Sequence, residues 1–196
     1  MSDLRLKLAA RARLLSWLSL AYMAVEGAVA LWAGATADSA ALLGFGLDSV
    51  IEGLASVIVI WRFSGARTFS EAAELRARKA VAVTFFLLAP YIVVEVVLSG
   101  RPEPSWPGIG LAVASLIVMP LLGVAKKRLG AQLGSGATAG EGTQNLLCAY
   151  LAGAVLLGLL GNALFGLWWL DPAVALVVAG LAVREGIENW RGDDCC

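Results

Sequence analysis

Histidine is absent from this chain of 196 residues, and cysteine occurs only three times. Without histidine the usual ligand spacings of zinc sites are missing, and three cysteines do not indicate a disulfide framework. The glycines between residues 130 and 142 are not followed by the Lys-Ser/Thr pair of a phosphate-binding loop, and no nucleophile has a histidine as its base. The sequence therefore does not predict an enzyme.

Charged residues are also scarce in this chain. They make up 15% of it, against about 25% in a soluble domain, whereas 59% of the residues are hydrophobic. The fifteen basic residues are matched by fifteen acidic ones and are dispersed along the chain, which argues against nucleic acid as a partner. This composition predicts an integral membrane protein surrounded by a lipid bilayer.

Long apolar stretches predict an all-α, polytopic membrane protein with six transmembrane helices. The six-helix domain is expected to cover residues 14–190, after a basic interfacial lead-in at residues 1–13 and before a short tail at residues 191–196. The individual spans are expected at residues 14–37, 39–61, 80–100, 108–125, 143–170 and 171 to about 190.

Basic residues lie almost entirely on one side of these spans. Fourteen of the fifteen fall in residues 1–13, in segments 62–79 and 126–142, or near the C-terminal end, and only Arg101 falls on the opposite side. Because cytoplasmic segments are rich in Lys and Arg, both termini are expected in the cytoplasm.

The two longer cytoplasmic segments have different expected structures. Segment 62–79 is expected to lead into the third helix, with Ser70 as the N-cap and an i,i+4 pair between Glu74 and Arg78. Segment 126–142 begins with three basic residues and then contains five glycines, which predicts a flexible loop.

Two carboxylates stand out in the second apolar stretch. Asp48 and Glu52 are four residues apart, so on a helix both project from one face. A charge deep in hydrocarbon costs about 3 kcal/mol or more, and two like charges on one face repel each other unless protons or a cation neutralise them. The pair therefore indicates half of a metal-ion site.

Other polar residues in the spans have two interpretations each. Glu26 is either a proton carrier or a hydrogen-bonded polar group between helices. Glu95 is either a proton-carrying or accessory acid or a side chain that reaches water at the nearby membrane interface. Gln144 and Cys148, again four residues apart, are either ligands or a polar helix start and a small apolar filler.

Several of these motifs resemble the cation diffusion facilitator transporters. The resemblance covers the whole membrane portion: ALLGFGLDSVIEGLAS on the second span with its DxxxE pair, an i,i+4 polar pair at the start of the fifth, and LDPAVALVVAG opening the sixth. The chain looks most like a small bacterial branch of this family that lacks the cytoplasmic C-terminal domain.

The resemblance implies a metal site shared by the second and fifth helices. In the family, DxxxD on the second helix and HxxxD on the fifth form a tetrahedral site that exchanges zinc or a similar divalent ion for protons. These motifs fall on Asp48 and Glu52, and on Gln144 and Cys148. The fifth-helix pair departs from the family pattern, since an imidazole is lost and a thiol is gained, which favours softer, zinc-like ions.

The expected function is therefore efflux of a divalent transition metal by metal/proton antiport, in the inner (plasma) membrane of a bacterium. The alternative is a membrane metal sensor or auxiliary subunit of the same fold that does not transport. The metal is the transported substrate, and no permanently bound cofactor is expected. The expected partners are metal ions, protons, the lipid bilayer and, as one option, a second copy of the chain in a homodimer.

The tail carries Asp193, Asp194, Cys195 and Cys196 together. Two carboxylates and two thiols at a chain end either capture a soft metal for the pore or form a solvated terminus. The sequence leaves both interpretations open.

Overall fold

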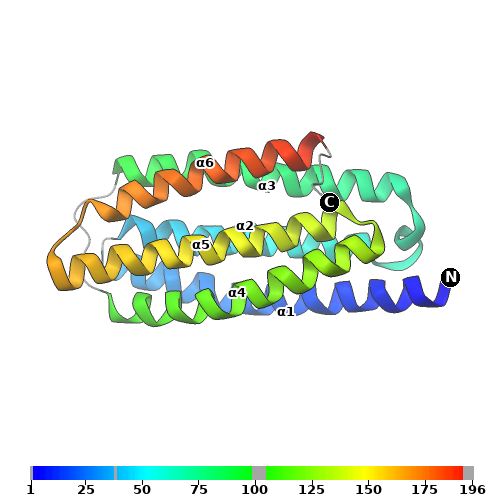
Figure 1. Ribbon diagram of the computed structural model, residues 1–196, viewed down its shortest axis with the longest axis horizontal. Helices are drawn as coiled ribbons and strands as arrows, with labels where there is room; N and C mark the ends of the chain where they lie inside the picture. Colours follow the sequence, from blue (N-terminus) through cyan, green and yellow to red (C-terminus); the bar gives the residue numbers. More distant parts are fainter. Residues whose placement is uncertain (1, 38, 99–104, 192–196) are drawn as a thin grey trace.

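The computed structural model describes residues 2–37, 39–98 and 105–191, and in these residues every regular element is a helix. Their helices run side by side along one long axis (Figure 1). The prediction of an all-α fold is confirmed. The elements are α1 (Ser2–Ala37), α2 (Ala40–Arg62), the short 3-10 helix η1 (Gly65–Phe69), α3 (Glu71–Leu98), α4 (Trp106–Leu133), α5 (Gly136–Phe165) and α6 (Leu170–Arg191).

Five of the helices, α1 to α5, are long and apolar enough to cross a membrane. Large apolar side chains are exposed on their outer faces, among them Leu121, Val97 and Phe165, as expected for surfaces that contact lipid. Over the described residues α6 does not meet the same criteria, so the sixth span stays a prediction. The basic lead-in is not a separate element, because α1 runs without interruption from Ser2 into the first span.

Helices α2 and α5 occupy the middle of the bundle (Figure 1). Helix α2 packs against α1, α3, α5 and α6, and α5 packs against α4, α6, α2 and α3. The largest apolar core cluster lies around them and includes Phe45, Phe85, Met119 and Leu159. Polar side chains on the facing sides of α2 and α5 are therefore shielded by other helices.

Segment 126–142 is helical rather than a flexible loop, so that prediction was wrong. Helix α4 continues to Leu133, and Gly134 ends it in the left-handed region at φ 60°. The Ser135 hydroxyl then accepts a hydrogen bond from the backbone N–H of Thr138 at 3.2 Å and caps α5. A glycine after one helix and a serine before the next confine the turn to two residues, although the surrounding composition is typical of a loop.

Glycines of this segment allow α4 and α5 to approach closely. A Cβ atom on Gly130 would lie 2.7 Å from the backbone N and 3.0 Å from the Cα of Ala139. A Cβ atom on Gly142 would lie 2.8 Å from the carbonyl oxygen of Gly123. Two glycines of the segment therefore serve helix packing.

We expect Gly130→Ala to lower the free energy of unfolding by about 1–3 kcal/mol, because its methyl group would press against backbone atoms that cannot rotate away. Gly110→Ala is the matched control, since it lies on the same helix with no atom within 4 Å of its Cβ position. The control should be neutral or slightly stabilising. Unfolding in detergent micelles checks both variants, and equal stability would contradict the close approach.

Glu74 joins the ends of the two central helices. Its Oε2 accepts a hydrogen bond from Arg62 Nε at 2.7 Å, at the end of α2. Its Oε1 accepts one from the backbone N–H of Ala137 at 2.9 Å, in the first turn of α5. The expected Glu74–Arg78 pair is therefore replaced by a tertiary contact, because Arg62 and a backbone N–H in the first turn of α5 lie within reach of the same carboxylate.

The expected N-cap of α3 is confirmed. The Ser70 hydroxyl accepts a hydrogen bond from the backbone N–H of Ala73 at 3.2 Å. Helix α3 thus begins at Glu71, and the segment between α2 and α3 contains the short helix η1.

Candidate metal centre

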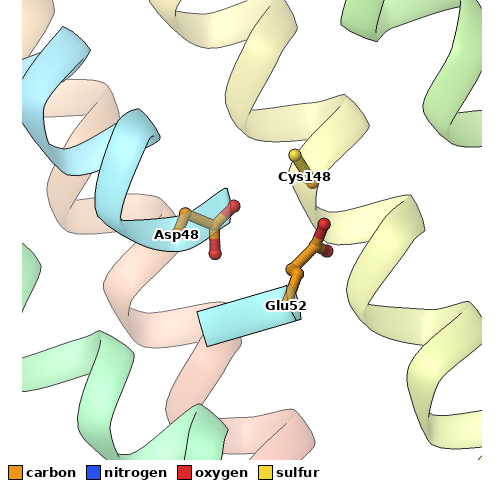
Figure 2. A group of neighbouring side chains, drawn as sticks. All are labelled: Asp48, Glu52 and Cys148. Carbon is orange, nitrogen blue, oxygen red and sulfur yellow. The ribbon is translucent and has the colours of Figure 1, made fainter. Parts of the chain in front are cut away.

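Asp48 and Glu52 on α2 and Cys148 on α5 converge on one point. A carboxylate oxygen from each acid and the Cys148 Sγ all lie within 4.8 Å of one another. Figure 2 shows the two acids on α2 pointing into the space between α2 and α5, where Cys148 meets them. The prediction that these residues come together is confirmed.

The geometry of this cluster follows from helical periodicity and helix packing. Asp48 and Glu52 are just over one turn apart, so they share the face of α2 that α5 covers. All three side chains are buried, with exposures of 3% for Asp48, 3% for Glu52 and 0% for Cys148. Water cannot provide the solvation that two carboxylates require at this depth.

The carboxylate of Glu52 has no hydrogen-bond partner among the described residues. Both of its oxygens are buried and accept no hydrogen bond within the described part of the chain. The two buried basic residues of that part are already paired, Arg62 with Glu74 and Lys126 with Glu141. An uncompensated carboxylate is costly in such surroundings, so the arrangement favours either a proton or a bound cation at Glu52.

The donor set of the cluster is two carboxylates and one thiol. Zinc binds carboxylate oxygen and thiolate sulfur in tetrahedral sites, whereas magnesium and calcium prefer oxygen alone. Three protein donors leave one position of a tetrahedral site open for a further ligand. The cluster can therefore hold a zinc-like divalent ion.

Gln144 lies one turn before Cys148 on α5 and is also buried. Its Nε2 donates a hydrogen bond to the Thr84 hydroxyl of α3 at 2.6 Å. Its Oε1 is buried and accepts no hydrogen bond from the described residues, so it keeps an oxygen donor one helical turn from Cys148. Thr84 orients the amide, and the predicted role of Gln144 as a ligand stays a prediction.

Glu26 is buried between α1, α2 and α4 and is satisfied by hydroxyl groups. The Ser49 hydroxyl donates to its Oε2 at 3.1 Å, and the Ser115 hydroxyl donates to its Oε1. Ser115 also contacts the Tyr22 hydroxyl at 3.0 Å. These contacts match the interpretation of Glu26 as a hydrogen-bonded polar group between helices, while its role as a proton carrier stays a prediction.

Two further sequence predictions fall outside what the structure describes. Glu95 lies on α3, but its side chain is not among the described ones. Cys195 and Cys196 lie beyond residue 191, the last described residue.

A second buried polar cluster, which the sequence did not predict, connects α4, α5 and α1. Lys126 Nζ donates to Glu141 Oε1 and to Asn145 Oδ1, both at 2.8 Å, and the Ser16 hydroxyl donates to Glu141 Oε2 at 2.8 Å. Lys126 was assigned to a solvated loop, yet its side chain is 0% exposed. The signal available in the sequence was the spacing of Glu141, Asn145 and Cys148, which places all three on one helical face.

No protein-family model matches this chain. The chain is 31% identical over 179 residues to Transmembrane protein 163 of Xenopus laevis. The aligned region covers 88% of this chain and 64% of that protein, so the chain spans less than two thirds of its relative. Similarity to a transmembrane protein and five long apolar helices agree that this is a multi-pass helical membrane protein.

Proposed function

We propose that this protein carries divalent transition-metal ions of the zinc type across a membrane, with Asp48, Glu52 and Cys148 as the transport site. The observation that supports this most strongly is the convergence of three buried ligands from two central helices, one of which, Glu52, has two unpartnered carboxylate oxygens. A permanent structural role would provide these oxygens with fixed partners. A transport site leaves them for its substrate.

The proposed topology has six spans with both termini in the cytoplasm, in the plasma membrane of a bacterium. Fourteen of fifteen basic residues on one side of the spans support this orientation. One end of the bundle brings together the starts of α1, α3 and α5 and the ends of α2 and α4 (Figure 1). We call this the cytoplasmic end, and the cluster lies between it and the opposite end.

The proposed transport mechanism is exchange of metal for protons, as in the cation diffusion facilitators that the motifs resemble. Carboxylate and thiol groups bind a metal only after they lose their protons, so protons and metal compete for the same atoms. Protons from the outer side would displace the ion, and the ion from the cytoplasmic side would displace the protons. Competition of this kind couples the two fluxes without a separate proton site.

The donor set also predicts the preferred substrate. With a thiolate at Cys148 the site carries three negative charges, which attract divalent ions strongly, and the sulfur favours softer ions over magnesium and manganese. Zinc, cadmium and cobalt are therefore the expected substrates, with zinc the leading physiological candidate.

Uptake into proteoliposomes tests this function. We expect zinc, cadmium and cobalt to accumulate faster than manganese, and an opposing pH gradient to accelerate uptake several-fold over vesicles at equal pH. Protein-free vesicles and vesicles with a collapsed pH gradient are the controls. Tight binding of zinc to the purified protein without flux would favour the sensor or auxiliary subunit instead, and absence of both would overturn the metal site.

A further inference from the structure

The second buried cluster already holds a positive charge. The Lys126 ammonium is in contact with a carboxylate oxygen of Glu141 and an amide oxygen of Asn145, each at 2.8 Å. The Ser16 hydroxyl completes the set through its hydrogen bond to the other oxygen of Glu141 at 2.8 Å. Two oxygen-bearing side chains of α5 thus contact one cation that belongs to α4, and a hydroxyl group of α1 holds the other oxygen of Glu141.

Along α5, this cluster lies between the transport site and the cytoplasmic end. Glu141, Asn145 and Cys148 follow one face of α5, and seven residues of helix separate Glu141 from Cys148 by roughly 10 Å. Glu141 lies near the start of α5, which is at the cytoplasmic end. An ion that enters from the cytoplasm along this face meets Glu141 before it reaches the metal cluster.

The donors around the ammonium are also ligands for metal ions. Carboxylate, amide and hydroxyl oxygens bind divalent cations, and the Met119 sulfur, which accepts a hydrogen bond from Asn145 Nδ2 at 3.3 Å, lies beside them. We propose that Glu141, Asn145 and Ser16 form a second cation station on the cytoplasmic side of the transport site, which Lys126 occupies in this structure. A divalent ion takes this station when the ammonium withdraws.

The charges involved favour exchange at this station. Glu141 is 2% exposed, so loss of the ammonium without another positive charge in its place would be costly for the carboxylate. A divalent ion and an ammonium at the same oxygens would repel each other, so only one of them occupies the station. Lys126 therefore acts as a tethered cation that fills the station between passages of the substrate, an inference that rests on the proposed transport function.

A purely structural ion pair makes a different prediction. In that case Glu141 needs only the ammonium, and removal of Lys126 leaves a destabilised protein without new metal affinity. The station, in contrast, should become a permanent metal site once its tethered cation is removed. Metal binding by a protein whose transport site has been disabled therefore distinguishes a structural ion pair from a cation station.

The experiment uses the full chain in detergent with Asp48→Asn and Glu52→Gln, which disable the transport site. The parent protein is this double variant, and Zn²⁺ binding is measured by equilibrium dialysis. We expect the parent with Lys126→Met added to bind one Zn²⁺ ion at the station, with an affinity at least tenfold higher than that of the parent for the same site. Lys127→Met is the matched control, because Lys127 is the exposed neighbour of Lys126. Thiols of the tail contribute equally to both proteins.

A further Glu141→Gln substitution should abolish the added Zn²⁺ binding. If Lys126→Met does not yield folded protein, Lys126→Gln replaces it, because glutamine retains a hydrogen-bond donor for Glu141 but carries no charge. Lys127→Gln is then the control. Equal Zn²⁺ binding by the Lys126 and Lys127 variants overturns the station. The transport site is disabled in every protein of this experiment, so the result does not depend on metal flux. The proposed function is tested separately, by flux through the unmodified protein.

Discussion

Asp48→Asn is expected to reduce metal flux to the level of protein-free vesicles, a loss of at least about 100-fold. The amide keeps the shape of the side chain but removes one of the two charges that α2 contributes to the cluster. Loss of an outer-shell partner alone costs about 10- to 100-fold in metal affinity, so loss of a direct ligand should cost at least the upper end of that range. Membrane insertion should not suffer, because a neutral amide is less costly in hydrocarbon than a carboxylate.

Flux assays on reconstituted protein check this result, with the amount of inserted protein measured in the same vesicles. Glu71→Gln is the matched control, since it also neutralises an acid but at an exposed position of α3. Glu52→Gln should resemble Asp48→Asn, with a smaller loss if Glu52 serves mainly as the proton acceptor. Normal flux by correctly inserted Asp48→Asn protein would contradict the assignment of Asp48 to the site.

The sequence was sufficient to locate Asp48 and Glu52 because both signals that identify them are local. Two acids inside an apolar stretch are conspicuous, and a spacing of four places them on one helical face whatever the rest of the chain does. The same holds for the first five helices and for the Ser70 cap, which depend on periodicity and on the residues next to them. Only the precise ends of the helices needed the structure, because α1, α4 and α5 extend beyond their apolar parts.

The spacing on α5 indicates a shared face for Glu141 and Asn145, but it does not show that Lys126 covers this face, because the residues of the cluster come from three helices. Lysine, glutamate and glycine at the end of an apolar stretch are typical of a solvated loop, and only the packing of α1 and α5 against α4 removes Lys126 from water. Glu74 is a similar case. The i,i+4 rule is worth only a few tenths of a kcal/mol, so a buried arginine and a helix N-terminus outweighed Arg78 as its partner.

Cys148→Ser is expected to lower zinc and cadmium transport strongly, by about 10-fold or more, whereas Cys148→Asp should recover zinc and lose the preference for cadmium. A thiol next to a cation deprotonates and provides both charge and a soft sulfur donor, while serine keeps only the approximate size. Aspartate restores the charge with a hard oxygen. Zinc and cadmium flux measured side by side for both variants therefore separates the contribution of charge from that of softness.

The opposite pattern would identify Cys148 as an apolar filler of the core around α2 and α5. Serine would then be nearly silent, and aspartate would be harmful because it adds a buried charge without a partner. The structure distinguishes the two roles clearly, because the Cys148 sulfur is buried within 4.8 Å of both carboxylates. Without a metal, an aspartate at position 148 would be a third acid next to Asp48 and Glu52. A variant with three carboxylates that still folds and transports zinc therefore requires a cation at the centre of the cluster.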